Sequence, residues 1–499
     1  MMDDRNVLHS TLSWAVRISV TLMACVAFTQ TPEAKAEAPD VVVVKAAMLH
    51  VGNGETIAGG MLVIRGDRIV QVGRDLTVPA GATVIELAVG AITPGLIDAN
   101  AAIESRTIMA PASPSARQVL REMFESHRGH RHAGVGINCC GSTCPKSLQH
   151  VTGKPCPMCG FPDAPPDLVV GTRPSSSRVE TSSEVIPETR IIDSVDLRSE
   201  DFDRLVSGGV TMVFVAPDSA AVIGSQGAIV RTGGAAKDRV VRETDAIMAS
   251  MGTDPSWRGG FNRPPFRRFV NFHVRRPTTR MGVAWVFRKA MYDTKRRDAG
   301  EDVYGADAPS DAAMAVLHRV LSHEVPLRIQ ARTQHDITSA MRLAKEFDLP
   351  FTLVEATEAH RCVDELKAAG IPVVYGPIYV EAPGHRANSS EVDNARLHTL
   401  KALLDAGVTT ALTAHELRDE DGLARQVMYA MRFGVSPEDA LRCVTSAAAE
   451  VLGVAEDVGT LAPGKRADVV VWTGQPFVGT SRPAVVLIGG RVVLDRRGG

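Results

Sequence analysis

The sequence lacks an excess of charge of either sign. Its 55 lysines and arginines are balanced by 57 aspartates and glutamates, so the formal net charge is −2 over 499 residues. A protein that holds nucleic acid by its phosphates needs a basic surface, and we therefore expect no nucleic-acid partner. The hydrophobic content of 44% is typical of a globular protein long enough for one large domain and one smaller domain.

Hydrophobic runs of membrane-spanning length are absent after the N-terminus. Near the start, Trp14–Phe28 is mostly apolar but too short to cross a bilayer, and the small-x-small pattern Ala34–Ala36 follows it. These features predict a signal peptide over residues 1–36 and a periplasmic or secreted protein. The charge of Arg17 inside the run leaves an uncleaved anchor open, and Cys25 leaves a lipid anchor open. Only in those two cases would we expect attachment to a membrane.

Short strands with tight turns are predicted near both ends of the chain. The apolar stretches that indicate them are Val41–Val44, Met61–Ile64, Ile69–Val72, Ala467–Trp472 and Val485–Ile488. Neither end has enough strands to close a core alone. We therefore predict one composite β-sandwich from residues 41–92 and 455–499, with everything between them inserted into it.

A helix that ends in glycine, then a β-branched residue and a buried strand, occurs three times in the middle of the chain. The three copies span Leu205–Val215, Leu366–Tyr375 and Leu403–Leu412. Further strands are predicted at Ile92–Ile97, Leu327–Ala331 and Phe351–Val354, and a helix over Ile337–Phe347. This order is typical of parallel βα units. The predicted fold class is α/β, with a (β/α)8 TIM-like barrel over residues 93–454 favoured over a doubly wound sheet.

Residues 127–187 interrupt this rhythm and are predicted to be an insertion on a barrel loop, because their first part is rich in cysteine, histidine, glycine and proline. Two cysteine pairs, Cys140 with Cys144 and Cys156 with Cys159, are separated by eleven residues, a spacing close to that of structural zinc sites. Nearby histidines also allow a mixed Cys/His site or copper binding. Disulfides are an equal alternative in an exported chain, so metal and disulfide both stay open.

Four stretches of the chain carry a resemblance to a known family. They are Pro94–Ala99, Gly209–Thr211, Arg280–Val283 and Gly459–Asp468. They are similar to signatures of the amidohydrolase superfamily, in particular its imidazolonepropionase-like branch, and the resemblance covers nearly everything from Val41 onward except the insertion. It implies hydrolysis of C–N bonds in cyclic amides, dipeptides or related compounds, with one or two divalent metals at the C-terminal ends of the barrel strands.

The metal-ligand positions implied by the resemblance hold other residues. The family's His-x-His reads Asn100-Ala101-Ala102 here, its later histidines fall at Gln330 or Arg332 and at Glu355, and its catalytic aspartate falls at Ala414. An amide is a poor metal ligand, a methyl group is none, and a guanidinium repels a cation. We therefore expect no metal at the barrel centre. The prediction is a pseudoenzyme that acts as the partner subunit of an active paralogue, as a homo-oligomer, or as a binding protein for an unknown small molecule.

Two alternatives are kept beside this prediction. Glu355, His360 and His415 lie at or just past strand ends and could form a relocated metal site in an active amidohydrolase. The same alternative of an active enzyme also allows Asp98 and Glu104 to carry out acid/base chemistry without a metal. In the second alternative, the cysteine-rich insertion is a metal-binding module that binds zinc and the barrel is its scaffold.

Overall fold

The computed structural model describes most of the chain from Val41 onward. The described residues are 41–103, 182–256, 277–305, 308–378, 394–415 and 422–497, with Arg178, Glu180 and Glu391. The predicted signal peptide, Glu104 and the four paired cysteines lie outside this set. None of the helices within it is long and apolar enough to cross a membrane.

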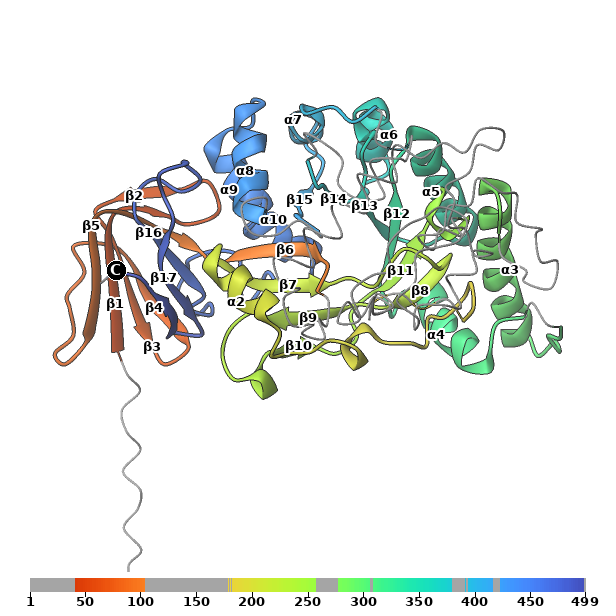
Figure 1. Cartoon of the computed structure of the whole chain (residues 1–499), viewed down its shortest axis with the longest axis horizontal. Helices are drawn as coiled ribbons and strands as arrows, with labels where there is room; N and C mark the ends of the chain where they lie inside the picture. Colours follow the sequence, from red (N-terminus) through yellow and green to blue (C-terminus); the bar gives the residue numbers. More distant parts are fainter. Residues whose placement is uncertain are drawn as a thin grey trace, which may run out of the picture. The chain divides into compact units, whose positions relative to one another are not determined.

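The two ends of the chain build one eight-stranded sheet (Figure 1). Its strands are β1 (Val41–His50), β2 (Thr56–Ala58), β3 (Gly60–Arg65), β4 (Arg68–Arg74), β5 (Thr83–Pro94), β16 (Val469–Trp472), β17 (Pro483–Ile488) and β18 (Arg491–Asp495). The join is the antiparallel pair of β5 and β16, in which Thr93 lies opposite Val470. The backbone nitrogen of Ile69 on β4 also donates at 2.9 Å to the oxygen of Lys465, which lies just before β16. The predicted composite of both termini is confirmed.

The middle of the chain supplies the barrel strands. They are β6 (Leu96–Ala101), β7 (Val210–Val215), β8 (Ile223–Gln226), β9 (Ala228–Arg231), β10 (Val240–Arg242), β11 (Ile247–Ser250), β12 (Leu327–Ala331), β13 (Phe351–Glu355), β14 (Val373–Tyr375) and β15 (Thr410–Leu412). Strand β6 is parallel to β7, and β11 to β15 are parallel to one another in chain order. The antiparallel strands β8 and β9 connect the two groups, since β9 pairs with β7 and β8 with β11. The α/β class with TIM-type strand order is the predicted one.

Helices cover these strands on the outside (Figure 1). They are α2 (Glu200–Ser207), α3 (Arg280–Asp298), α4 (Asp311–Leu321), α5 (Gln334–Phe347), α6 (Val363–Ala368), α7 (Thr399–Asp405), α8 (Leu423–Arg432), α9 (Pro437–Cys443) and α10 (Ser446–Val451). The predicted helix, glycine and strand units are all present. In each of them the glycine that follows the helix adopts a left-handed backbone, with φ of 83° at Gly209, 63° at Gly370 and 73° at Gly407.

One predicted element is divided in the structure. The stretch Ile92–Ile97, predicted as a single strand, is the end of β5 and the start of β6, which belong to different sheets. Gly95 lies at the boundary, and a Cβ there would come within 2.1 Å of the Thr211 hydroxyl oxygen. Its nitrogen donates to Asp468 of the terminal sheet at 2.9 Å. The chain therefore enters the barrel at this glycine.

Candidate functional site

A cluster of buried ions lies at the C-terminal ends of β12 and β13. Arg332 directly follows β12, and the carboxylates of Asp254, Glu355 and Glu391 surround its guanidinium at nitrogen–oxygen distances of 2.6, 2.5 and 2.9 Å. The side chains of Arg332, Glu355 and Glu391 are only 2%, 4% and 2% exposed. We call these four residues the guanidinium cage.

Every N–H group of the Arg332 guanidinium has a carboxylate acceptor in the cage. Asp254 accepts from Nη1 and Nη2, Glu355 accepts from Nε and Nη2, and Glu391 accepts from Nη1. An arginine has five N–H donors and no acceptor. Burial would lower the pKa of Arg332, but the carboxylates of Asp254 and Glu355 outweigh it and hold the pKa well above its ordinary value. Arg332 is therefore a permanent internal cation whose donors are all used within the chain.

A second arginine and an amide extend the cage. Arg280 on α3 donates to Asp336 on α5 at 2.7 and 3.0 Å. It also donates at 2.9 Å to Oε1 of Glu391, whereas Arg332 donates to Oε2 of the same carboxylate. Glu391 thus bridges two guanidinium groups. The Gln330 side chain, in the amide orientation that satisfies its hydrogen bonds, accepts from Arg332 at 3.2 and 2.9 Å. Gln330 and Arg332, the two residues that the sequence left open for one histidine position, thus contact each other.

The backbone at the end of β13 adopts a rare conformation. Glu355 and Ala356 have φ of 69° and 52°, in the left-handed region that non-glycine residues seldom occupy. Such residues cost on the order of 1–3 kcal/mol each and persist only where the surroundings hold them. The ion pair of Glu355 with Arg332 and the hydrogen bond from Ala356 to the Ala331 oxygen supply that restraint. Glu355 is therefore held toward the cage by its backbone as well as by its charge.

Arg328 offers a contrast on the same strand. It is as buried as Arg332, yet its partners are the Ala99 carbonyl oxygen, at 2.7 Å, and the ring of Phe214, whose centroid lies 3.8 Å from the guanidinium carbon. Burial lowers its pKa to about 10. One strand thus carries two buried arginines, of which only Arg332 has carboxylates around it.

Asp98 joins the first and last barrel strands. Its carboxylate accepts from the Thr413 hydroxyl at 2.5 Å and from the backbone nitrogens of Asn100 and Ala414 at 3.0 Å each. All of these donors are neutral. Burial raises the pKa of Asp98 above its ordinary value, although the three hydrogen bonds act in the opposite direction. We call this contact between β6 and β15 the seam. It gives Asp98 a structural role.

The other predicted metal positions near the seam offer few donors. The Nδ1 atom of His415 lies 2.9 Å from the Asn100 carbonyl oxygen and 3.2 Å from the Asn100 side-chain nitrogen. The side-chain oxygen of Asn100 is buried and has no hydrogen-bond partner. Ala102 and Ala414 are buried and present methyl groups. One amide oxygen and two methyl groups do not fit a divalent metal, which takes three or more imidazole, thiolate or carboxylate ligands.

The three residues predicted as a relocated metal site have separate partners. Glu355 is paired with Arg332, His415 with Asn100, and His360 has its Nδ1 3.1 Å from the Thr399 hydroxyl oxygen. Within the described part of the chain, no group of three or more histidine, cysteine, aspartate or glutamate side chains is placed to hold a metal ion. The residues described here thus fit an internal guanidinium and do not fit the metal that the fold implies.

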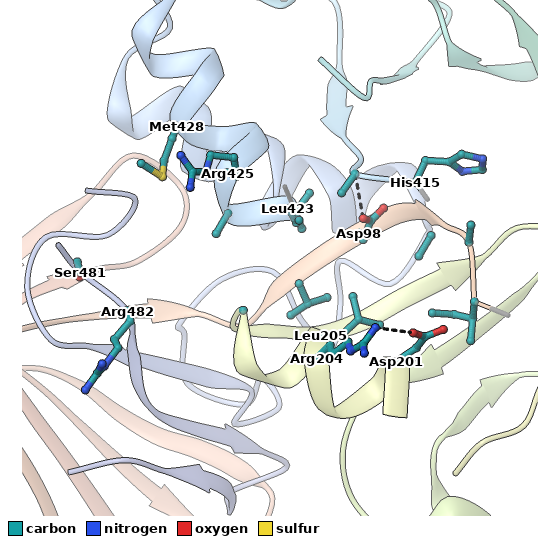
Figure 2. Close-up of a pocket in the computed structure, with 18 of the residues that line it drawn as sticks. Asp98, Asp201, Arg204, Leu205, His415, Leu423, Arg425, Met428, Ser481 and Arg482 are labelled. Atoms are coloured by element: carbon teal, nitrogen blue, oxygen red, sulfur yellow. Dashed lines mark hydrogen bonds and ion pairs between the residues drawn. The ribbon is translucent and has the colours of Figure 1, made fainter. Parts of the chain in front are cut away.

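A cavity of about 490 Å³ lies beside the seam (Figure 2). Asp98, Ala414 and His415 line one side, and helices α2 and α8 line the others. On α2, Arg204 approaches Asp201 to 3.9 Å, and α8 contributes apolar side chains such as Leu423. The cavity is thus mostly apolar with a few charged groups, a lining typical of small-molecule sites.

Sequence reasoning missed two of the cage carboxylates. Asp254 follows β11, a strand that was not predicted, and Glu391 lies outside the named helices and strands; no motif marks either residue. The resemblance marked Arg332 only as a possible replacement of a histidine, whereas its burial in the structure requires charged partners. The four cysteines of the predicted metal or disulfide site lie outside the described residues.

Comparisons with known proteins agree with this fold. Residues 351–493 match the model of the amidohydrolase family. The chain is 25% identical over 343 residues to amidohydrolase tasK of Hapsidospora irregularis, a match that covers 63% of this chain and 34% of that protein. The chain therefore spans about a third of the length of this curated relative.

A solved structure shows the same fold over nearly the whole chain. The amidohydrolase from Thermotoga maritima MSB8 superposes with a TM-score of 0.68 at 24% sequence identity, covering 91% of this chain and all of that one. The amidohydrolase family model matches residues 351–493, and none of these matches separates the branches of that family, so the imidazolonepropionase-like branch stays a prediction.

Proposed function

We propose that this chain is an amidohydrolase-family protein that keeps the family's barrel as a binding scaffold and does not hydrolyse C–N bonds with a metal-activated water. The observation that carries this proposal is the Arg332 guanidinium, held by three carboxylates at the mouth of the barrel. A cation that belongs to the chain already neutralises the carboxylates at the barrel mouth.

The chemistry supports this proposal at two further positions. Metal-assisted hydrolysis needs an ion that lowers the pKa of a bound water and a group that accepts the proton of that water. The resemblance places a metal ligand at Ala102 and the catalytic aspartate at Ala414. A methyl group can neither bind a metal nor accept a proton. Asp98 is a buried carboxylate that contacts the backbone of Ala414, and its oxygens already accept three hydrogen bonds at the seam.

We propose the cavity beside the seam as the place where a small molecule binds. Its volume of about 490 Å³ lies within the range of roughly 300–1,000 Å³ common for small-molecule sites. The apolar walls from α8 would contact the body of the ligand, and polar groups such as His415 would orient it. Binding here requires neither a metal nor a movement of the guanidinium cage.

Metal analysis combined with turnover assays tests the proposal. The full chain and a variant lacking residues 127–162 are purified and assayed for bound metal and for cleavage of cyclic amides and dipeptides, with and without a chelator. We expect no chelator-sensitive cleavage, and any metal in the full chain to be lost with the deletion. Metal that stays after the deletion, or cleavage that a chelator abolishes, would contradict the proposal.

Export is proposed separately, on the strength of the apolar run Trp14–Phe28 and the Ala34–Ala36 pattern. Cell fractionation and N-terminal sequencing of the mature protein test it. A periplasmic or secreted protein that begins near residue 37 is the expected result. A full-length chain in the cytoplasmic fraction would contradict it.

A further inference from the structure

We propose that Asp254, Glu355 and Glu391 form a binding site selective for a planar amidinium cation, and that Arg332 of the same chain fills this site. The inference deepens the proposed function and rests on it in taking the barrel mouth to be free of metal. It adds a specific claim: the carboxylates are arranged for the shape of a guanidinium and not merely for a positive charge.

The contacts follow the outline of the guanidinium group. Asp254 binds the edge formed by Nη1 and Nη2 at 2.8 and 2.6 Å, and Glu355 binds the edge formed by Nε and Nη2 at 2.5 and 3.3 Å. Glu391 takes the remaining N–H of Nη1 at 2.9 Å. Two-edged binding of this kind matches the fixed fork of a guanidinium. A spherical ion offers no edges to match.

The spacing of the carboxylates disfavours a divalent cation. They lie on different sides of a three-nitrogen group, and no three acidic, histidine or cysteine side chains of the described residues converge as metal ligands do. Small hard cations need oxygen ligands at about 2.0–2.6 Å from one centre. The negative charge of the cage would attract any cation, but the positions of its carboxylates match a planar cation and not a spherical one.

The cage carboxylates depend on a cation to remain buried. Glu355 and Glu391 are almost fully buried, and the Asp254 side chain is 17% exposed, so Asp254 is the side of the cage nearest to solvent. Removing Arg332 takes away the cation that all three carboxylates share, although Arg280 still contacts Glu391, and this loss of positive charge destabilises the fold. It also leaves a space of the shape and charge of the guanidinium that was removed. A free amidinium ion from solution would be expected to enter it.

Chemical rescue of the Arg332→Ala variant tests the proposal. Thermal unfolding of the full chain is followed with methylguanidinium or acetamidinium at millimolar concentrations, well below the molar range in which guanidinium denatures proteins. We expect a lower melting temperature for R332A and a rise that saturates as either cation is added. Urea, which is planar but neutral, and MnCl₂ are expected to give no such rise, and the parent protein should not respond to either amidinium.

Arg328→Ala is the matched control. It removes an equally buried arginine from the same strand but leaves the carbonyl of Ala99 and the ring of Phe214 in place of carboxylates. Amidinium ions should therefore not raise its melting temperature. Equal rescue of R328A and R332A, or rescue of R332A by MnCl₂ or urea as well as by amidinium, would overturn the selectivity claimed here. If R332A folds and amidinium ions do not raise its melting temperature, the proposed site is wrong.

A second measurement covers an R332A variant that does not fold. Arg332→Lys and Glu355→Gln are made singly and together, and the unfolding stability of the four proteins is compared. The cage predicts strongly non-additive effects, because a lysine keeps the charge but cannot make the two-edged contact with Glu355, so either substitution costs less once the other is present. Additive effects would overturn it. Every readout is stability. Detection of hydrolase activity would therefore overturn the proposed function and leave the cage intact.

Discussion

The seam and the guanidinium cage satisfy buried carboxylates in two different ways. At the seam, Asp98 accepts only neutral donors, and burial raises its pKa. In the cage, three carboxylates surround a cation, and the attraction holds the pKa of Arg332 high. Both sites join barrel strands at the C-terminal end, where enzymes of this fold place their chemistry. In this chain the same positions are used to hold the strands together.

Because the seam uses neutral donors and the guanidinium cage uses a cation, we expect substitutions at the two sites to lower stability by different amounts. Neutral hydrogen bonds contribute modestly to stability and can be replaced, whereas a buried charge that loses its partner is costly. The cage should therefore be the more fragile of the two sites when one charge is removed. At the seam, we instead expect the contribution of Asp98 to stability to change with pH.

The largest expected effect is that of Arg332→Met. Removing the central cation takes away the guanidinium that the three carboxylates share, although Arg280 still contacts Glu391, and we expect a loss of about 3–5 kcal/mol in the free energy of unfolding. Urea unfolding of parent and variant measures it. Arg280→Met is the matched control, because Arg280 is 39% exposed and contacts the cage from outside. A loss for R332M no greater than that for R280M would contradict the account.

The next effect is that of Asp98→Asn at the seam. The asparagine keeps the size of the side chain but points a donor at a position where a backbone or hydroxyl donor already lies. We expect a loss of about 1–3 kcal/mol at neutral pH. The Thr413→Val variant, which removes one of the three donors to Asp98, should cost less. If D98N unfolds at the same urea concentration as the parent, the seam does not hold β6 to β15.

A pH series sharpens the comparison. Since burial raises the pKa of Asp98 in the folded protein, folding takes up a proton at this residue. The stability that Asp98 contributes through its titration is therefore full below the unfolded carboxyl pKa of about 3.9 and is lost as the pH rises through the raised value. The difference in unfolding free energy between the parent and D98N should therefore shrink as the pH rises through that window. A difference that grows with pH would contradict a raised pKa of Asp98.

The smallest effect is expected for Gln330→Leu. The five N–H groups of Arg332 all have carboxylate acceptors, so the Gln330 amide supplies an additional contact. We expect a loss of about 1 kcal/mol or less in unfolding free energy. A loss as large as that of R332M would mean that the amide, and not the carboxylates, stabilises the guanidinium.

The sequence predicts the scaffold well and the cage only in part. Glycines after helices and buried valine-rich runs are local signals, and they located the helix and strand units and the two halves of the terminal sheet. Gln330, Arg332 and Glu355 were singled out because the resemblance to the amidohydrolase superfamily places ligand positions at the ends of these strands. Asp254 begins a short 3-10 helix after β11, a strand that was not predicted, and Glu391 lies outside the named helices and strands. The contact of both residues with Arg332 depends on three-dimensional packing that no local pattern encodes.

The same limit applies to the interpretation of Arg332. From the sequence, a guanidinium at a ligand position only excludes a metal. In the structure it also supplies a cation, because three carboxylates distant in sequence converge on it. The division of Ile92–Ile97 at Gly95 has a similar cause, since the contact with Thr211 that requires a glycine is not local.

Anomalous scattering from crystals of the full chain grown with zinc tests the central claim most directly. The account predicts electron density for the Arg332 guanidinium among Asp254, Glu355 and Glu391, and no anomalous peak between Gln330 and Ala414. A zinc ion bound at the barrel mouth, with Arg332 turned away from its carboxylates, would contradict it.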